Sequence, residues 1–400
     1  MLSGKTVAVG VTGGIAVYKA AQLVSDLKAG GAEVHVIMTR SAKEFVRPLT
    51  FQVLSGNRVH TDLFEPAADG SVRHIGLATR PDLLVIVPAT ANIIGKVAGG
   101  IADDLLSTVI MAAACPVLFC PAMNVNMYDN RIVQRNLNIL RDSGYHFVGP
   151  GTGRLACGVS GRGRLADLED IMERIILLLN RDGDLKGLVV LITAGPTVEP
   201  MDPVRYISNR SSGKMGYTLA QAAARRGAKV VLISGPTALK PPYGVELIKV
   251  ETAAQMYDAV MEKFNHADVV IKSAAVADYR PGMVSGQKIK KHGDRLTVEL
   301  VKNPDILAEL GRKKTCQILV GFAAETEELE NNAMRKVTSK NLDFLVANDV
   351  TQAGAGFGSD TNIAKFVYPD GTITTLPQME KSALAHRILD EVVNLLRIEQ

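Results

Sequence analysis

The sequence contains no tryptophan, and aromatic residues occupy only 5% of its 400 positions. Its four cysteines form no C-x-x-C pair, so they indicate neither a zinc site nor a disulfide framework. No apolar run is long enough to cross a bilayer, and the chain enters a strand pattern directly, without a leader-like segment. The 45 basic and 41 acidic residues leave a net charge of +4 without a basic block, which argues against nucleic-acid or membrane partners. We therefore expect a cytoplasmic protein with small-molecule ligands.

Short β-branched runs alternate with longer helical patterns along the whole chain. The strands are expected at residues 6–11, 33–38, 83–87 and 117–119, and then at 188–193, 229–233, 268–271, 318–320 and 343–346. This alternation is typical of an α/β protein whose parallel sheets are covered by helices on both faces. A polar, Gly-containing stretch near residues 182–186 separates the halves, so we predict two Rossmann-like domains, 1–182 and 186–400.

The first half opens with a loop that suits a phosphate. Thr12, Gly13 and Gly14 stand between a strand and an amphipathic helix, where backbone N–H groups and the helix dipole favour an anion. The spacing is not G-x-G-x-x-G, and the second strand is followed by Thr39 and Ser41 where a dinucleotide fold has an acidic residue. A mononucleotide or flavin phosphate therefore fits better than NAD, although a packing turn without a ligand is the alternative.

Two further segments, "PATAN" at 88–92 and "GIADDLLST" at 100–108, follow at the same sheet edge. Their hydroxyls and amides, including those of Thr90, Asn92 and Ser107, suit a neutral ring and an anionic phosphate. Alternatively, Asp103 caps a helix and Ser107 faces solvent. His74, expected just before a short helix, is a lone histidine and such residues are commonly structural.

The segment "PGTGRLACGVSGRGRL" combines Cys157 with five glycines and three arginines. This composition argues against a packed element and favours a mobile lid, in which Arg154, Arg162 or Arg164 lowers the pKa of the Cys157 thiol. Cys115 and Cys120 lie on apolar runs and are expected to be inert core residues.

Together with these motifs, "PAMNVNM" at 121–127 resembles the flavin-containing phosphopantothenoylcysteine decarboxylases. The resemblance implies that FMN does the redox chemistry, that Asn124 holds the substrate carboxylate, that His74 acts as base and that Cys157 donates a proton. Tyr128 stands where the family usually has tryptophan. The residues expected around the cofactor are Gly13, Gly14, Thr39, Ser41, Thr90, Asn92, Ser107 and Met123.

In the second half, a long polar loop runs from residue 193 to 216 and ends in "SSGK" at the start of a helix. Loops of this length inside a compact domain are usually functional, and a helix start suits a phosphate. "SSGK" alone is only a fragment of a P-loop, because the first glycine of that motif is missing.

Three later segments, "SAAVADYRP", "KIKK" and "VKNPDILAEL" with "GFAAET", make the second half resemble phosphopantothenate–cysteine ligases. The resemblance implies that CTP activates a carboxylate with Mg²⁺ or Mn²⁺, that Asn209 assists conversion of the acyl-cytidylate, and that Arg205 lies beside it. "KIKK" by itself reads equally well as a solvated charge run. The residues implied at CTP are Asp278, Lys288, Pro304, Asp305, Ile306, Leu307, Phe322, Lys336 and Lys340.

The two halves would act in succession in coenzyme A biosynthesis, from 4'-phosphopantothenate, cysteine and CTP to 4'-phosphopantetheine. The same resemblance implies a homo-oligomer, with ligase dimers, decarboxylase trimers and a dodecamer as the largest assembly. One alternative is another flavoprotein of this superfold, such as a prenyl-flavin synthase or a peptidyl-cysteine decarboxylase, joined to an unrelated nucleotide-binding domain. A second alternative is a non-enzymatic flavin-binding regulatory or scaffold protein.

Overall fold

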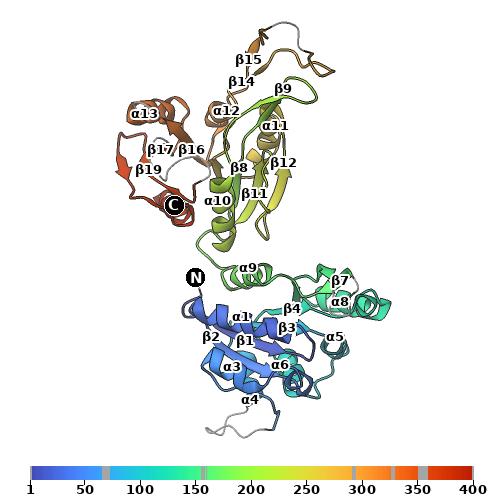
Figure 1. The fold of residues 1–400 in the computed structure, drawn as a ribbon. Helices are drawn as coiled ribbons and strands as arrows, with labels where there is room; N and C mark the ends of the chain where they lie inside the picture. Colours follow the sequence, from blue (N-terminus) through green and yellow to red (C-terminus); the bar gives the residue numbers. More distant parts are fainter. Residues whose placement is uncertain are drawn as a thin grey trace. The chain divides into compact units, whose positions relative to one another are not determined.

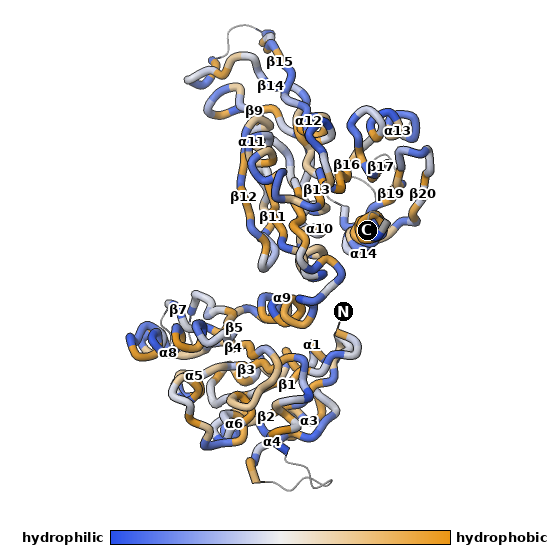
Figure 2. The backbone as a smooth tube through the Cα atoms, turned by 180° about the vertical axis from the view of Figure 1, so that it is seen from behind, coloured by the Kyte–Doolittle hydropathy of each residue, from blue (hydrophilic) through white to orange (hydrophobic). Residues whose placement is uncertain are grey.

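The computed structural model describes residues 2–64, 73–154, 158, 160–290, 294–325, 329–349 and 359–398. The chain forms two compact units, residues 1–180 and 181–400 (Figure 1). Each unit is built around a mainly parallel sheet with helices on its faces, so the predicted α/β class is confirmed. Apolar residues are frequent along the strands of both sheets, whereas the helices carry both apolar and polar residues (Figure 2).

The first unit contains a five-stranded parallel sheet of order β2-β1-β3-β4-β5. Its elements are β1 (Thr6–Val11), α1 (Val17–Ala29), β2 (Glu33–Met38), α2 (Arg40–Lys43), α3 (Pro48–Ser55), α4 (Arg73–Thr79), β3 (Leu83–Ala89), α5 (Ala91–Ala98), α6 (Leu105–Met111), β4 (Val117–Pro121), α7 (Val125–Tyr128), α8 (Arg131–Asp142), β5 (His146–Phe147), β6 (Gly151–Arg154), β7 (Ser160–Arg164) and α9 (Leu168–Leu179).

Every residue of β3 is buried, because helices cover both faces of the central strands. One core cluster packs α4, α5, α6 and α8 on the sheet, while α1 and α9 contact β3 outside that cluster. The strand order reverses between β1 and β3, so the carboxyl ends of these two strands open the crevice where an open α/β sheet binds its ligand.

The second unit contains an eight-stranded sheet of order β12-β11-β8-β13-β16-β17-β19-β20. Its elements are β8 (Val189–Ala194), β9 (Val198–Pro200), β10 (Tyr206–Ser208), α10 (Lys214–Arg225), β11 (Lys229–Ser234), β12 (Glu246–Lys249), α11 (Ala253–Phe264), β13 (Val269–Lys272), β14 (Tyr279–Pro281), β15 (Leu300–Lys302), α12 (Ile306–Lys313), β16 (Ile318–Glu325), α13 (Leu329–Ser339), β17 (Phe344–Asp349), β18 (Thr361–Asn362), β19 (Ala364–Val367), β20 (Ile373–Thr375), β21 (Met379–Glu380) and α14 (Lys381–Ile398).

The second sheet differs from the purely parallel prediction at one edge. β19 pairs antiparallel with β17, and β20 pairs antiparallel with β19. β19 has four residues and β20 has three, which is too short for either to stand out as a strand in the sequence. Two antiparallel pairs, β9 with β10 and β14 with β15, lie apart from this sheet, and β14 and β15 extend away from it (Figure 1). The β9–β10 pair occupies part of the segment 193–216 that was expected to be a loop.

Candidate functional site

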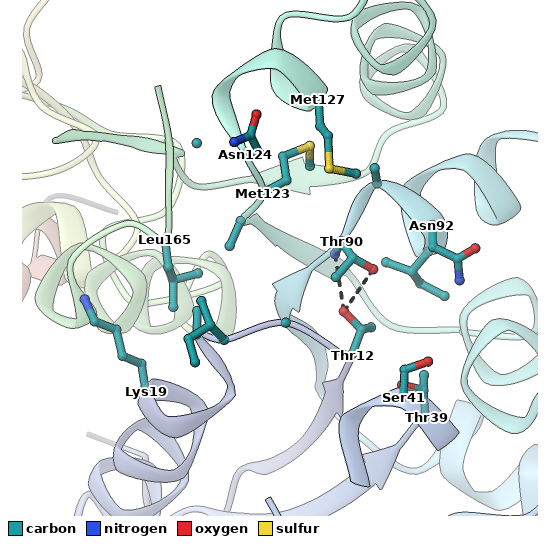
Figure 3. A pocket seen from close by; sticks show the side chains of 18 of the residues that line it. Thr12, Lys19, Thr39, Ser41, Thr90, Asn92, Met123, Asn124, Met127 and Leu165 are labelled. Carbon is teal, nitrogen blue, oxygen red and sulfur yellow. Dashed lines mark hydrogen bonds between the residues drawn. The ribbon is translucent and has the colours of Figure 1, made fainter. Parts of the chain in front are cut away.

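The first unit has a cavity of about 1090 Å³ at the carboxyl edge of its sheet. It is formed by the loops after β1, β2, β3 and β4 together with the β6–β7 hairpin (Figure 3). A volume near 1000 Å³ is at the upper end for small-molecule sites. The described lining residues include Thr12, Gly13, Gly14, Lys19, Thr39, Ser41, Thr90, Asn92, Lys96, Asp104, Met123, Asn124, Met127, Arg154, Arg164 and Leu165.

Thr12 joins the two central strands at the back of this cavity. Its hydroxyl is buried, donates to the carbonyl of Pro88 at 2.6 Å and lies 3.2 Å from the hydroxyl of Thr90. The Thr90 backbone N–H in turn donates to the Thr12 oxygen at 3.3 Å (Figure 3). These bonds fix the loops after β1 and β3 to each other, which pre-forms the crevice between them.

Gly13 allows the first loop to approach the start of α2 closely. A β-carbon at position 13 would lie 2.4 Å from the Cβ of Ser41 and 2.8 Å from its backbone carbonyl. Thr39 caps α2, because its side-chain oxygen accepts from the Ala42 N–H at 3.3 Å. The loop residues predicted around a phosphate therefore meet at one place: the cavity is lined by Gly13, Gly14, Thr39 and Ser41.

Lys96 and Asp104 form a charged part of the cavity wall. This charged pair was not predicted, because only hydroxyls and amides were expected at this sheet edge. The Lys96 ammonium lies 2.6 Å from Asp103 and 2.8 Å from Asp104. Burial lowers the pKa of Lys96, but hydrogen bonds to both carboxylates outweigh this and raise it above its usual value. Burial raises the pKa of Asp104, but its bonds to Lys96 and to Ser107 leave it lowered.

Ser107 lies in the first turn of α6, where it forms a capping box with Asp104. Its side chain is fully buried, and the described residues that line the cavity do not include it. The solvent-facing alternative for Ser107 is therefore wrong, and the residue that caps α6 is Asp104 rather than Asp103.

Met123 and Asn124 follow β4, and Met127 lies close to them in the short helix α7 (Figure 3). The Asn124 side chain caps the short helix α7 by accepting from the Asn126 N–H at 2.8 Å. Tyr128 is only 7% exposed and belongs to the core cluster beneath this loop. The aromatic ring at position 128 thus packs between the core and the segment that carries Asn124.

The Gly-rich segment forms a regular element, which corrects the prediction that it lacks one. β6 and β7 pair antiparallel, and the carbonyl of Gly163 accepts from the Met123 N–H at 2.9 Å. Gly163 has φ +130°, and a β-carbon there would lie 2.4 Å from the Met123 carbonyl oxygen, so the glycine lets the hairpin pack on the loop. Arg154 and Arg164 line the cavity, whereas Cys157 lies outside the described residues.

His74 lies in the first turn of α4 rather than before a helix. It is half-buried, and the described lining residues of the cavity do not include it. Burial raises the pKa of both Cys115 and Cys120, which keeps these thiols protonated and unreactive, in agreement with the prediction of inert cysteines.

In the second unit, the predicted residues of the loop before α10 are held near the end of β13. The Asn209 side-chain amide donates to the Ala275 carbonyl at 3.0 Å. The Ser211 oxygen accepts from the Gly213 N–H at 3.3 Å, and Lys214 forms an ion pair with Asp360 at 2.7 Å. The segment before α10 and its first residue are therefore held by one local hydrogen bond and by contacts with Ala275 and Asp360.

Asp305 and Lys340 meet at the start of α12, close to the end of β13. Asp305 caps α12, and the Lys340 ammonium lies 2.8 Å from its carboxylate. Burial raises the pKa of Asp305, but the bonds from Lys340 and the Ala308 N–H leave it lowered. Lys272, the last residue of β13, was not predicted as a site residue. Burial and the charge of Lys340 lower its pKa to about 8, although the carboxylates of Asp305 and Asp278 act in the opposite direction.

The other residues implied at CTP occupy different environments. Asp278, Lys288 and Pro304 are exposed, Phe322 on β16 is half-buried, and Lys336 is a half-buried residue of α13. Ile306 and Leu307 are core residues with 1% and 6% exposure, so only their backbone can face a ligand. Arg205 is bonded to Asp202 and to the Ile289 carbonyl, next to Lys288.

Among the described residues, no group of three or more His, Cys, Asp or Glu side chains is arranged to hold a metal ion. No helix in the same part of the chain is long and apolar enough to span a membrane.

Comparison with known proteins identifies the family. A model described as Flavoprotein matches residues 1–180, and one described as the DNA/pantothenate metabolism flavoprotein C-terminal domain matches residues 185–396. The Coenzyme A biosynthesis bifunctional protein CoaBC of Bacillus subtilis (strain 168) is 50% identical over 398 residues, which cover 99% of this chain and 98% of that protein. The chain belongs to the CoaBC family.

The CoaBC protein of Escherichia coli (strain K12) is 46% identical over 396 residues, covering 98% of this chain and 97% of that protein. A crystal structure of the C-terminal domain of a CoaBC protein is 43% identical, with a TM-score of 0.47, and covers 54% of this chain and 98% of its own. Membership of the CoaBC family confirms the resemblance that the motifs of both halves predicted.

Proposed function

We propose that this CoaBC family member is a bifunctional enzyme of coenzyme A biosynthesis. Its second unit condenses 4'-phosphopantothenate with cysteine at the expense of CTP, and its first unit decarboxylates the product with FMN to give 4'-phosphopantetheine. The observation that carries this proposal is the pairing of full-length CoaBC relatives with a cavity lined by the Gly13–Ser41 contact, Asn124 and two methionines.

The cavity fits a flavin mononucleotide in size and in chemistry. Gly13, Gly14, Thr39 and Ser41 offer backbone N–H groups and hydroxyls to a phosphate, while Met123, Met127 and Leu165 offer apolar surface to a ring system. When bound, FMN would take two electrons from the substrate's cysteine portion and later return them. Thr90 and Asn92 would offer the cofactor further polar contacts.

Asn124 would bind the carboxylate that leaves as carbon dioxide. A neutral amide holds this carboxylate without stabilising it as strongly as an arginine would, so the ground state is not over-bound. His74 would act as the base and Cys157 as the proton donor. Since the described cavity of one chain does not include His74, its role requires either a neighbouring copy or a movement of α4. The homo-oligomer that the resemblance implies would provide such a copy.

In the second unit, CTP would supply the leaving group that a carboxylate needs before it can condense with an amine. Lys288, Lys336 and Lys340 would offset the charge of the triphosphate, and Mg²⁺ or Mn²⁺ would arrive with the nucleotide. Asn209 would act on the acyl-cytidylate from its place beside the end of β13. We assign these activities to residues 1–182 and 186–400 and place the enzyme in the cytoplasm.

The test is mass spectrometry of the products that the purified chain forms from 4'-phosphopantothenate, cysteine and Mg²⁺, with CTP, with ATP or without nucleotide. CTP-dependent 4'-phosphopantetheine is the expected product. Accumulation of phosphopantothenoylcysteine in a flavin-loaded preparation would contradict the decarboxylase assignment, and no condensation with CTP would contradict the ligase assignment.

A further inference from the structure

The carboxylate of Asp202 is almost fully buried, with 3% of the residue exposed, and it accepts five hydrogen bonds. One oxygen accepts from the backbone N–H groups of Val204 and Arg205, each at 2.8 Å. The other accepts from Nε and Nη2 of Arg205, at 2.9 and 2.6 Å, and from the backbone N–H of Ile289 at 3.1 Å. Burial raises the pKa of Asp202, but these bonds outweigh it and hold the carboxyl ionised far below its usual range.

Both backbone polar groups of Ile289, the N–H and the carbonyl, are hydrogen-bonded to Asp202 and Arg205. Its N–H donates to Asp202, and its carbonyl accepts from Nη2 of Arg205 at 2.6 Å. A third bond, from the Ser285 N–H to the Met201 carbonyl at 3.0 Å, joins the same two segments. The loop after β14 is thus fastened to the loop before β10 by what we call the Asp202–Arg205 clamp, defined by Asp202, Arg205 and Ile289.

The clamp acts on backbone groups adjacent to Lys288 and not on the Lys288 side chain. Lys288 is exposed and lies in the 18-residue connection between β14 and β15. A connection of this length has many accessible conformations unless contacts of its own restrict them. The N–H that Asp202 binds belongs to the peptide bond between Lys288 and Ile289. The clamp therefore fixes the backbone position from which the Lys288 side chain extends.

We propose that Asp202 and Arg205 are positioning residues that hold Lys288 in place for the nucleotide. This inference rests on the proposed ligase function, in which Lys288 meets the triphosphate, and it gives Arg205 a role through Ile289 instead of contact with the acyl-cytidylate. Because a lysine must be placed to within about an ångström to be effective, loosening the clamp is expected to lower kcat/KM for CTP roughly 10- to 100-fold.

The experiment uses the full chain with four changes: Asp202→Asn, Arg205→Lys, Lys288→Met and, as a matched control, Asp184→Asn. Arg205→Lys keeps a cation beside the buried Asp202 but cannot reproduce the fork that reaches Ile289, so it tests the clamp even if Asp202→Asn does not fold. Asp184→Asn removes a different carboxylate–arginine pair, with Arg226, which does not involve the β14–β15 connection.

The first measurement is limited trypsin digestion with mass-spectrometric mapping of the rates of cleavage after Lys288 and Lys290. We expect clamp variants to be cut at least several-fold faster at Lys288 and Lys290, and Asp184→Asn to be unchanged there. The second is a double-mutant cycle on kcat/KM for CTP: Arg205→Lys should have little further effect once Lys288 is methionine. A purely structural role would give additive losses.

Each outcome decides between the hypotheses. Unchanged cleavage in the clamp variants would overturn the clamp, whatever the ligase does. Faster cleavage with unchanged CTP kinetics, or additive losses in the cycle, would overturn the positioning role while leaving the ligase assignment intact. If the wild-type chain makes no product with CTP, the proposed function and the role of the clamp fail together.

Discussion

Replacing Gly13 by alanine tests whether the Gly13–Ser41 contact creates the proposed phosphate site. The new methyl group would lie 2.4 Å from the Ser41 Cβ and 2.8 Å from its backbone carbonyl carbon and oxygen, so one of the two loops must move. Overpacking of this kind costs about 1–3 kcal/mol. If only the loop after β1 shifts and the rest of the fold is unchanged, this energy weakens FMN binding roughly 5- to 150-fold.

Gly14→Ala provides the matched control, because its methyl group would lie 3.6 Å from the nearest atom, Cγ2 of Thr90, which is an ordinary contact. The assay is titration of flavin-free protein with FMN, followed by quenching of flavin fluorescence, with thermal denaturation in parallel. We expect a large loss of affinity for Gly13→Ala and a small one for Gly14→Ala. Equal affinities for the two variants, or a loss confined to Gly14→Ala, would refute the reasoning.

Three other changes test separate parts of the chain. Asn124→Asp sets like charge against the substrate carboxylate, so phosphopantothenoylcysteine should accumulate while CTP-dependent condensation continues; carbon dioxide release equal to that of Asn126→Asp would contradict this. Lys272→Met should stabilise the second unit at pH 7 by at most about 3 kcal/mol, because the pKa of Lys272 is about 8 in the folded protein and 10.5 ordinarily. Between pH 8 and 10.5 the unfolded wild-type chain binds more protons at this lysine than the folded chain does. The wild type should therefore gain stability as pH rises from 8 to 10.5, and thermal denaturation of both proteins across this range checks the sign. Arg226→Met removes a 13% exposed guanidinium from Asp184 and Asp390, and should destabilise the second unit by roughly 1–2 kcal/mol in the same assay.

Much of the sheet architecture could be predicted because buried parallel strands leave a strong signal. β3 is buried along its whole length and reads as a continuous apolar run. β19 and β20 have no such signal: they are short, and their pairing with β17 depends on neighbours brought together by the fold. The β6–β7 hairpin was missed for a different reason, since glycine is a poor strand former and its packing against Met123 is a long-range contact.

The position of the candidate site could be predicted where its residues directly follow the ends of strands. Thr12, Gly13 and Thr90 lie at the reversal of strand order, and any parallel sheet brings such residues together. The partners of Arg205 could not be predicted in this way. Ile289 lies 84 residues farther along the chain, and neither residue carries a periodic signal that would link it to the other.

The net charge of the chain does not reveal how the proposed anion-binding regions are built. In the first cavity Lys96 is paired with Asp104, and in the second unit Lys340 is paired with Asp305. A lysine that is partly buried would be costly without a counter-ion, so each cation is held in place by a carboxylate before any ligand arrives. A phosphate that binds at either lysine must displace the carboxylate or share the ammonium group with it. The lysine therefore attracts the phosphate less strongly than an unpaired lysine would. The backbone N–H groups of the Gly13–Gly14 loop carry no such competing charge, so we expect the phosphate contact in the first unit to depend on loop geometry more than on the number of basic residues.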